Sequence, residues 1–325
     1  MKIAKAGLSS IQDLGRTGYR NFGITTGGAM DRMALRLCNL LVANEPGAAA
    51  IEISAGPWEA TAEEPLLLAV GGNGQRISAG EKELRCWQPF VLKAGDKLRI
   101  ESPLGGYAIL AVHGGFRCVP VLGSRSTHLS GKFGGWNGRP LATGDDITTT
   151  QLQTAAAEKI IKQLGGKPGI RAFRLSDAVI PNYNREFFRY VPAHEADWFE
   201  PASVTALHEN SFDLTHLSNR TGARLFGEPL QFNTDKQMVS TAVVPGTMQV
   251  SANGQILVLL ADAQTAGGYP RIGQLASVDI AILAQQKPGA TLRFKPISRQ
   301  EAETLCLQQR QQFEQLQRDY SLYFS

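Results

Sequence analysis

The sequence predicts a mainly β protein with a few helices, and three observations support this fold class. Short apolar runs recur at close spacing, and each is bounded by glycine, proline or aspartate, as strands joined by turns are. The chain contains 34 glycines, a high number that suits many turns. Its 325 residues, 43% of them hydrophobic, are enough for two packed domains or one large domain.

The first half of the chain begins with a short strand and a loop within residues 1–30. Asp31 is a candidate N-cap for a helix that continues to about Ala43, because apolar side chains recur there on one helical face. Five strands are predicted next, and their spacing is typical of a β-barrel or a sandwich: Ala49–Ser54, Leu66–Val70, Phe90–Lys93, Lys97–Glu101 and Tyr107–Val112.

The middle of the chain contains a predicted helix and a predicted linker. Apolar residues at helical spacing favour a helix over Gln151–Leu164, and two glycines stop it. The sequence GGKPG at Gly165–Gly169 is the best candidate for a linker. Six strands follow: Ile170–Leu175, Phe212–Thr215, Val239–Val243, Met248–Val250, Ile256–Ala261 and Thr291–Pro296.

The chain is expected to close with a helix. Ser298 and Glu301 make a capping box. An apolar stripe follows it, made by Ala302, Leu305, Cys306, Phe313, Leu316 and Tyr320. We therefore predict an N-terminal β-barrel-like domain over residues 1–165, a C-terminal β-barrel domain over 166–297, and a helix over 298–325 that packs on the barrel.

Composition also narrows the class of function. Lysines and arginines are scattered and the formal net charge is only +4, which argues against nucleic-acid binding. No apolar run reaches the roughly 20 residues of a membrane helix, and no secretory signal is visible. The cysteines lack the spacing of zinc ligands; they are Cys38, Cys86, Cys118 and Cys306. We expect a cytoplasmic protein with reduced thiols and no metal ligands.

The most informative stretch is Leu257–Arg271, where a near-continuous apolar run ends in a loop dense with polar groups. Two glycines within the loop are able to take positive φ and to admit a ligand close to the backbone. The polar and special residues are Asp262, Gln264, Thr265, Gly267, Gly268, Tyr269 and Arg271. From spacing alone, a functional loop and an ordinary turn with surface ion pairs are equally well supported.

Three further clusters are candidates for binding. Gln12–Arg16 places Asp13 and Arg16 around a turn at Gly15, although a local ion pair is the simpler interpretation. A second cluster, with the side chains of Ser124, Arg125 and Thr127, suits a carboxylate or a phosphate. In the third, Arg220 and Arg224 flank a glycine and suit an anion or two surface ion pairs. His113 follows an apolar strand and is expected to be partly buried.

The sequence contains no P-loop, no dinucleotide-binding fingerprint and no nucleophile elbow.

Several motifs, taken together and in order, resemble a known family. They are QDLGR at Gln12–Arg16, GAMD at Gly28–Asp31, NLLVAN ending at Asn44, IEI at Ile51–Ile53, AVHGGF at Ala111–Phe116, LGSRST at Leu122–Thr127, GGWNGRPLATGD at Gly134–Asp145, VVPGTMQV at Val243–Val250 and LLADAQTAGGYPRIG at Leu259–Gly273. The family is the biotin-dependent carboxyltransferase-like family, also called allophanate hydrolase subunit 2, which includes KipA-type proteins. The resemblance extends over nearly the whole chain, from about residue 7 to 305.

This resemblance implies cyclophilin-like β-barrel domains and an activity shared with other chains. The implied reaction is the ATP-dependent cleavage of 5-oxo-L-proline to L-glutamate. It is carried out together with two partners, a KipI-like B-type subunit and an A-type subunit, and with ATP and Mg²⁺ held by the complex. One alternative is the carboxyltransferase component of a biotin-dependent, urea-type carboxylase, with biotin on another chain. Another is a non-enzymatic, KipA-like regulator that binds a KipI-like kinase inhibitor.

The resemblance also implies which residues form the site. The implied catalytic residues are Asp13, Asp262, Gln264 and Tyr269, and the implied substrate-binding residues are Gln12, Arg16, Ser124, Arg125, Thr127, Arg220, Thr265, Gly267, Gly268 and Arg271. We expect the loops Gln12–Arg16 and Asp262–Arg271 to share one site. The alternative is that Asp262 and Arg271 merely pair with each other and set the shape of their loop. The chain departs from the family pattern at Ala193, Thr221, Ala223 and Ala266, which bears on the identity of the substrate.

Overall fold

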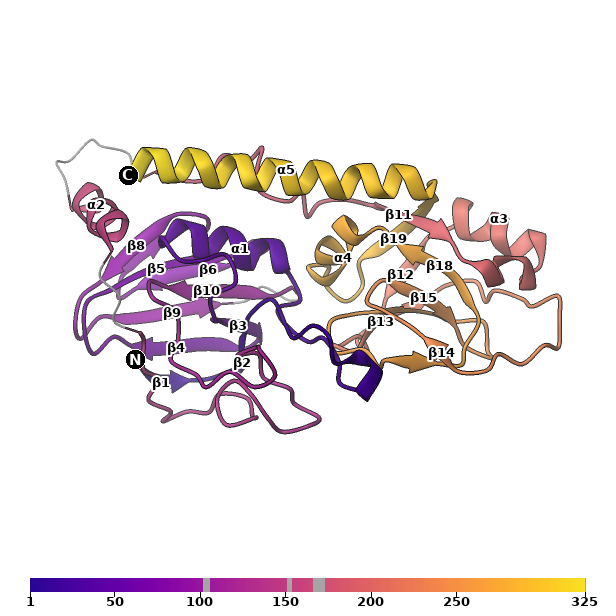
Figure 1. Ribbon diagram of the computed structural model, residues 1–325, viewed down its shortest axis with the longest axis horizontal. Helices are drawn as coiled ribbons and strands as arrows, with labels where there is room; N and C mark the ends of the chain where they lie inside the picture. Colours follow the sequence, from indigo (N-terminus) through magenta and orange to yellow (C-terminus); the bar gives the residue numbers. More distant parts are fainter. Residues whose placement is uncertain (102–105, 151–153, 166–172, 325) are drawn as a thin grey trace. The chain divides into compact units, whose positions relative to one another are not determined.

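Figure 1 shows the computed structural model, which describes residues 1–101, 106–150, 154–165 and 173–324. These residues form a mainly β protein with five α-helices, so the predicted fold class is confirmed. They divide into two compact units. The first consists of Met1–Arg16, Gly27–Pro181 and Gln312–Ser325, and the second of Thr17–Thr26 and Asn182–Gln311. Apart from Gly165, the predicted linker Gly165–Gly169 lies outside the described residues.

The first unit is built from two antiparallel sheets of five strands, in the orders β1–β4–β9–β6–β7 and β2–β3–β10–β5–β8. Trp58 and Ile100 of the one sheet and Ile51 and Leu110 of the other belong to a single buried core. The strands are β1 (Lys2–Lys5), β2 (Leu8–Gln12), β3 (Ala50–Ala55), β4 (Pro57–Thr61), β5 (Leu66–Gly71), β6 (Arg76–Ala79), β7 (Lys82–Leu84), β8 (Pro89–Leu92), β9 (Lys97–Glu101) and β10 (Ala108–Val112).

Two helices complete the N-terminal part of this unit. Helix α1 (Arg32–Leu41) contacts β5 and β10. It begins at the predicted cap, because a carboxylate oxygen of Asp31 accepts a hydrogen bond from the backbone nitrogen of Ala34 at 2.8 Å. Helix α2 (Ala155–Leu164) is shorter than predicted and ends at Gly165. The first three residues of the predicted helix, 151–153, lie outside the described residues.

The second unit is a closed barrel of seven strands in the order β11–β18–β15–β16–β13–β12–β19. Its neighbours are antiparallel except for β11 and β19, which are parallel. The strands are β11 (Phe187–Pro192), β12 (Phe212–Leu214), β13 (Gly222–Phe226), β15 (Thr247–Val250), β16 (Ile256–Leu259), β18 (Arg271–Leu275) and β19 (Thr291–Pro296). Phe188, Tyr190 and Phe212 pack their rings against Phe294 in the buried core. A separate two-stranded sheet joins β14 (Thr241–Ala242) to β17 (Ala266–Gly267).

The remaining helices are the short η1 (Arg20–Phe22) and η2 (His194–Trp198), and α3 (Pro201–Glu209), α4 (Ser277–Ala284) and α5 (Arg299–Phe324). The capping box of α5 is confirmed: Glu301 accepts hydrogen bonds from the backbone nitrogen and the hydroxyl of Ser298. On the predicted apolar stripe, Phe313 is buried but Cys306 is exposed. Phe313 lies under the guanidinium of Arg36, a residue of α1.

Several predicted strands differ from the structure. The stretch Val239–Val243 forms a strand only at Thr241–Ala242, and the described part of Ile170–Leu175, Phe173–Leu175, forms no strand. The N-terminal loop contains a second strand, β2, that was not predicted. Among the helices described, none combines the length and the apolar character needed to cross a bilayer.

Candidate functional site

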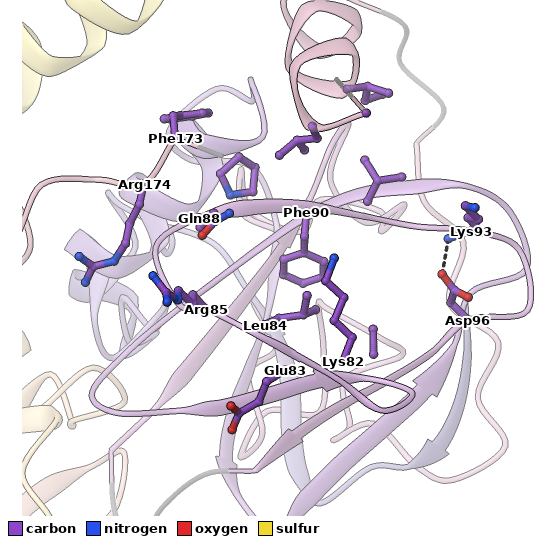
Figure 2. A pocket seen from close by; sticks show the side chains of 16 residues that line it. Lys82, Glu83, Leu84, Arg85, Gln88, Phe90, Lys93, Asp96, Phe173 and Arg174 are labelled. Carbon is purple, nitrogen blue, oxygen red and sulfur yellow. Dashed lines mark hydrogen bonds between the residues drawn. The ribbon is translucent and has the colours of Figure 1, made fainter. Parts of the chain in front are cut away.

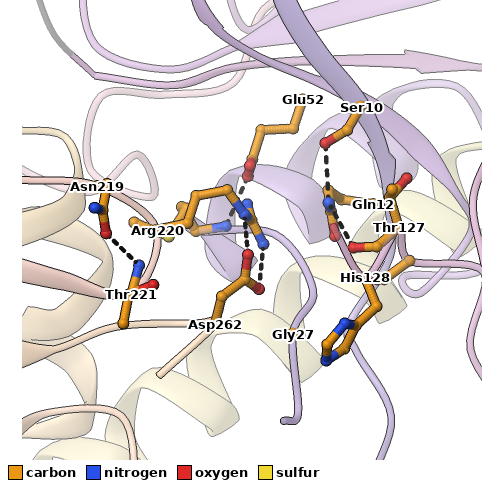
Figure 3. Close-up of polar contacts among 12 residues, drawn as sticks. Ser10, Gln12, Gly27, Glu52, Thr127, His128, Asn219, Arg220, Thr221 and Asp262 are labelled. Atoms are coloured by element: carbon orange, nitrogen blue, oxygen red, sulfur yellow. Dashed lines mark hydrogen bonds and ion pairs between the residues drawn. The ribbon is translucent and has the colours of Figure 1, made fainter. Parts of the chain in front are cut away.

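The loop that follows β16 begins at an ion pair between two of the predicted site residues. The guanidinium of Arg220 binds both carboxylate oxygens of Asp262, with Nε to Oδ2 at 2.7 Å and Nη2 to Oδ1 at 2.9 Å (Figure 3). The backbone supports this pair, because the nitrogen of Asp262 donates to the carbonyl of Arg220 at 2.9 Å. A bidentate pair of this kind fixes the orientation of the carboxylate.

Arg271 has a different partner, which the sequence did not reveal. Its guanidinium binds both carboxylate oxygens of Glu195, with Nε to Oε2 at 2.8 Å. Glu195 lies in η2, and its side chain is 7% exposed, against 26% for Arg271. The alternative that Asp262 and Arg271 pair with each other is therefore wrong. The pair instead ties the start of β18 to η2.

The Arg271 guanidinium lowers the pKa of Glu195 by hydrogen bonding, which outweighs the opposite effect of burial. A carboxylate whose pKa is lowered in the folded state contributes stability above its unfolded pKa, and this contribution is lost as the pH falls through the folded value. The pair is therefore fully formed at neutral pH.

Gln249 of β15 is a buried residue that supports the loop containing Gly267 and Gly268, which we call the glycine loop. The sequence did not predict this role. Its side-chain nitrogen donates to the carbonyl of Tyr269 at 3.2 Å, and its side-chain oxygen accepts from Gln264 at 3.4 Å. Gln249 is fully buried, whereas Gln264 is exposed. This amide connects two of the predicted site residues from below the loop.

The two glycines of the loop do not take positive φ, so that part of the prediction is wrong. Gly267 belongs to β17 and pairs with Thr241, which requires an extended backbone. Its lack of a side chain matters for another reason. A Cβ at Gly267 would lie 2.5 Å from the side-chain nitrogen of Gln249, whereas a Cβ at Gly268 would lie 3.2 Å from the hydroxyl of the exposed Ser240.

We expect Gly267→Ala to destabilise the second unit by about 1–3 kcal/mol, because the displaced amide of Gln249 is left buried with unmade hydrogen bonds. Gly268→Ala is the matched control and should unfold at nearly the wild-type temperature, because a serine hydroxyl is free to move aside. Thermal unfolding of both variants measures the difference. Equal stability of the two variants would contradict the role assigned to Gln249.

The segment Thr17–Thr26, which follows the predicted cluster Gln12–Arg16, belongs to the second unit. Arg20 of this segment donates hydrogen bonds to the carbonyl oxygens of Val243 and Gln264, the latter at 3.3 Å. Val243 in turn donates its backbone nitrogen to the carbonyl of Thr265 at 3.1 Å. Arg20 therefore holds the loop after β16 from the outside, a role that no local sequence signal indicated.

In the first unit, the carboxylate of Asp13 is surrounded by neutral donors. It accepts hydrogen bonds from the hydroxyls of Ser124 at 2.7 Å and Ser126 at 2.5 Å, and from the backbone nitrogens of Arg125 at 2.5 Å and Gly15 at 2.7 Å. Asp13 and the two serines are buried. The cluster predicted to bind an anion is thus folded around an anion of the protein itself.

Other predicted residues of this unit are also buried in its framework. Arg16 is 1% exposed, donates to the carbonyl of Ser126 at 2.6 Å and lies 4.9 Å from the ring centroid of Phe133. The hydroxyl of Thr127 donates to the carbonyl of Ile11 at 3.0 Å. The side-chain nitrogen of Gln12 donates to the hydroxyl of Ser10 and to the carbonyl of Thr127 (Figure 3).

Glycines of two further motifs pack against this cluster. Gly28 has a positive φ of 88°, and a Cβ there would lie 2.7 Å from the backbone nitrogen of Gly15. A Cβ at Gly134 would lie 2.3 Å from the carbonyl oxygen of Ser126. The motifs at Gln12–Arg16, Gly28–Asp31, Leu122–Thr127 and Gly134–Asp145, far apart in sequence, therefore meet in one place.

The structure thus gives the predicted residues two settings, one in each unit. Asp262, Gln264, Thr265, Tyr269, Arg220 and Arg271 lie in the second unit, and Gln12, Asp13, Arg16, Ser124, Arg125 and Thr127 in the first. That the two groups share one site stays a prediction.

Two further candidates differ in exposure. Arg125 has an exposed side chain, and His113 is partly buried, as expected, with its Nδ1 2.6 Å from the carbonyl oxygen of Val42.

A hollow of about 1250 Å³ in the first unit lies apart from all of these residues. It is bordered by the basic side chains of Lys82, Arg85, Lys93 and Arg174, and by the ring of Phe90 (Figure 2). None of the predicted site residues lines it. Across the described residues, no group of three or more histidine, cysteine, aspartate or glutamate side chains is arranged to hold a metal ion.

Comparisons with known proteins place these motifs in a family context. The sequence profile of the carboxyltransferase domain, subdomain A and B, matches residues 22–296. The C-type subunit of the Escherichia coli 5-oxoprolinase is 36% identical over 319 residues, which cover 97% of each chain. The urea amidolyase of Lachancea kluyveri is 27% identical over 91% of this chain, which spans only 17% of that protein.

Among solved structures, the urea amidolyase of Kluyveromyces lactis has a similar fold. It superimposes with a TM-score of 0.86 over 97% of this chain and 20% of its own length, at 23% sequence identity.

Proposed function

The chain belongs to the carboxyltransferase family of subdomains A and B, and from this membership we propose that it is the C-type subunit of an ATP-dependent 5-oxoprolinase. The observation that carries the proposal is the 36% identity to the corresponding Escherichia coli protein over 97% of both chains. A match of this extent leaves no large part of either chain without a counterpart. The proposed complex also contains a KipI-like B-type subunit and an A-type subunit.

The proposed reaction opens a stable lactam ring. The lactam oxygen of 5-oxo-L-proline attacks the γ-phosphorus of ATP, and ADP leaves. One water adds to the ring carbon, and the C–N bond breaks to give γ-glutamyl phosphate. A second water then releases phosphate and L-glutamate. Because the sequence has no P-loop, we assign the binding of ATP and Mg²⁺ to the complex rather than to this chain alone.

The second unit offers groups that suit this substrate. Glu195 occupies Nε and Nη2 of Arg271, so we assign the Nη1 group of this partly exposed guanidinium to the substrate carboxylate. Asp262 is held in a fixed orientation by Arg220 and is assigned to orient or deprotonate the attacking water. Gln264 and Tyr269 are exposed and able to contact the ring by hydrogen bonding or stacking.

We assign Asp13 a positioning role rather than a chemical one. Four donors already surround its carboxylate, and all of them are neutral groups of the protein. A carboxylate in this setting holds two loops together, and its acceptor positions are already occupied by groups of the protein. We therefore expect Asp13→Asn to lower activity indirectly, by displacing the loop that carries Arg125.

A second candidate function is supported by the family profile, which describes a carboxyltransferase. In that reaction a carboxyl group moves from biotin to urea or a related acceptor. This reaction requires a biotin carrier segment that brings carboxybiotin to the site.

One substrate panel separates the two functions. The chain is purified alone and as a complex with the A-type and B-type subunits from the same organism, and each preparation receives either 5-oxo-L-proline with ATP or urea with carboxybiotin. We expect L-glutamate and ADP from the complex, and neither from the single chain. Urea-dependent loss of carboxybiotin without glutamate formation would favour the carboxyltransferase instead.

A further inference from the structure

A groove of about 610 Å³ lies on the wall of the second-unit barrel, beside the ring of Tyr269. We call it the Tyr269 groove; its lining includes Thr215, Leu217, Arg224, Phe226 and Tyr269. Arg224 and Phe226 are alternate residues of β13 and are both exposed, while Leu225 between them is buried. The groove therefore occupies the outward face of the barrel, where side chains of alternate strand positions meet solvent.

Apolar side chains are unusually open to solvent here. Leu217 is 72% exposed, Phe226 is 65% exposed and Tyr269 is 49% exposed. Single exposed apolar residues are ordinary, but three large ones that line one groove mark a surface for interaction. Aromatic side chains at such surfaces are also the residues that contribute most to protein–protein binding.

The groove contains a charge that none of the described residues balances. Throughout the described part of the chain, the guanidinium of Arg224 makes no hydrogen bond or ion pair, whereas Arg220 and Arg271 each bind a carboxylate. The hydroxyl oxygen of Thr215 is buried and likewise has no hydrogen-bond partner among those residues. A binding partner with an acidic side chain satisfies the guanidinium of Arg224.

The groove is structurally continuous with the loop that carries the proposed site. Arg224 of β13 pairs in register with Leu257 of β16, and Leu257 pairs with Gln249 of β15. The side chain of Gln249 then donates to the carbonyl of Tyr269. Three adjacent strands therefore connect the unbalanced guanidinium with the glycine loop above Gln249.

From these observations we propose that the Tyr269 groove receives a segment of a partner protein in the complex, and that this segment places an acidic side chain, flanked by apolar ones, against Arg224. The inference rests on the proposed function, which requires partner proteins. Binding at this place covers the groove side of Tyr269 and fixes the position of the loop from Asp262 to Arg271. This binding gives a physical reason why we expect the chain to be inactive without its partners.

The test uses paired variants and the complex with the A-type and B-type subunits. Arg224→Glu and Phe226→Ser change the groove, and Lys287→Glu and Phe187→Ser are their controls, since Lys287 is exposed and Phe187 is 47% exposed on β11. We expect Arg224→Glu to weaken complex formation by about 100-fold and Phe226→Ser by about tenfold. The controls should bind like the wild type, and calorimetry should show that all four variants fold.

A further variant separates binding from stability. Thr215→Val keeps the shape of the side chain and removes a buried hydroxyl that has no hydrogen-bond partner among the described residues, so it should raise the unfolding temperature of the single chain and leave the affinity of the complex unchanged. Wild-type affinity of the Arg224 and Phe226 variants, in a complex that forms, would overturn the groove proposal alone. Failure of the wild-type chains to associate at all would overturn both the groove proposal and the proposed function.

Discussion

In the complex with its partner proteins, Asp262→Asn is expected to lower turnover by about 100- to 10,000-fold, the range typical of a lost general acid or base. The substitution keeps the size of the side chain and removes its charge. Arg220 is 14% exposed and would lose its bidentate partner. Activity should therefore fall while the chain still folds and still assembles, which gel filtration and calorimetry would verify.

Arg220 allows the chemical role of Asp262 to be separated from its structural role. If Asp262 served only to hold Arg220, Arg220→Gln would be as damaging as Asp262→Asn, and the double variant would be no worse than either. A chemical role predicts that Asp262→Asn is the more severe single change. Asp213→Asn is the matched control, because Asp213 is exposed and its side chain, among the residues that the structure describes, accepts a hydrogen bond only from the hydroxyl of Thr291. Near-wild-type turnover of Asp262→Asn would refute its assignment.

The second large effect is expected on stability, at a buried ion cluster that was not predicted from the sequence. Asp279 of α4 is fully buried and binds the guanidinium groups of Arg185 and Arg189. It also accepts the backbone nitrogen of Arg189 at 2.8 Å, which ties α4 to β11. Asp279→Ala leaves two partly buried cations without their carboxylate and should destabilise the barrel by about 3–5 kcal/mol.

Chemical denaturation of the wild type and the variant measures this loss. Glu303→Ala removes the carboxylate of a surface pair on α5, where both side chains are mostly exposed, and serves as the control. Such a pair contributes little, so the control should unfold at the wild-type midpoint. A barrel that tolerates Asp279→Ala as well as the control would show that the cluster is dispensable.

Elements with local signals could be predicted closely from the sequence. The N-cap at Asp31 and the capping box at Ser298 are set by side chains within three residues of the backbone groups they bind. Strand β19 was predicted with its observed bounds, Thr291–Pro296, because apolar and polar residues alternate there. These signals lie within one turn or one strand, and the sequence displays them directly.

Elements without such signals were missed. Helix α4 is almost uniformly apolar and shows no helical periodicity, so its sequence does not distinguish a helix from a strand. Strand β18 begins directly after Pro270 and contains a glycine, both of which weaken a strand prediction. Tertiary contacts determine both elements: α4 packs against β11, and β18 pairs with β11 and β15.

In the site, too, the features set by neighbouring residues were predicted and those set by distant contacts were not. The polar residues of the loop after β16 stand next to each other in the sequence, so the cluster was visible. Its partners were not, because Glu195 is 76 positions from Arg271 and Arg20 is 244 positions from Gln264. The fold alone decides which acid meets which arginine, and the simple pairing of Asp262 with Arg271 was therefore wrong.

Our central claim is that this chain is an essential part of an ATP-dependent 5-oxoprolinase. The most direct measurement is L-glutamate formation from 5-oxo-L-proline and ATP by the three purified chains together, with each chain left out in turn. We expect glutamate and ADP in equal amounts from the full set, and neither product when this chain is omitted. Undiminished glutamate formation without this chain would contradict the claim.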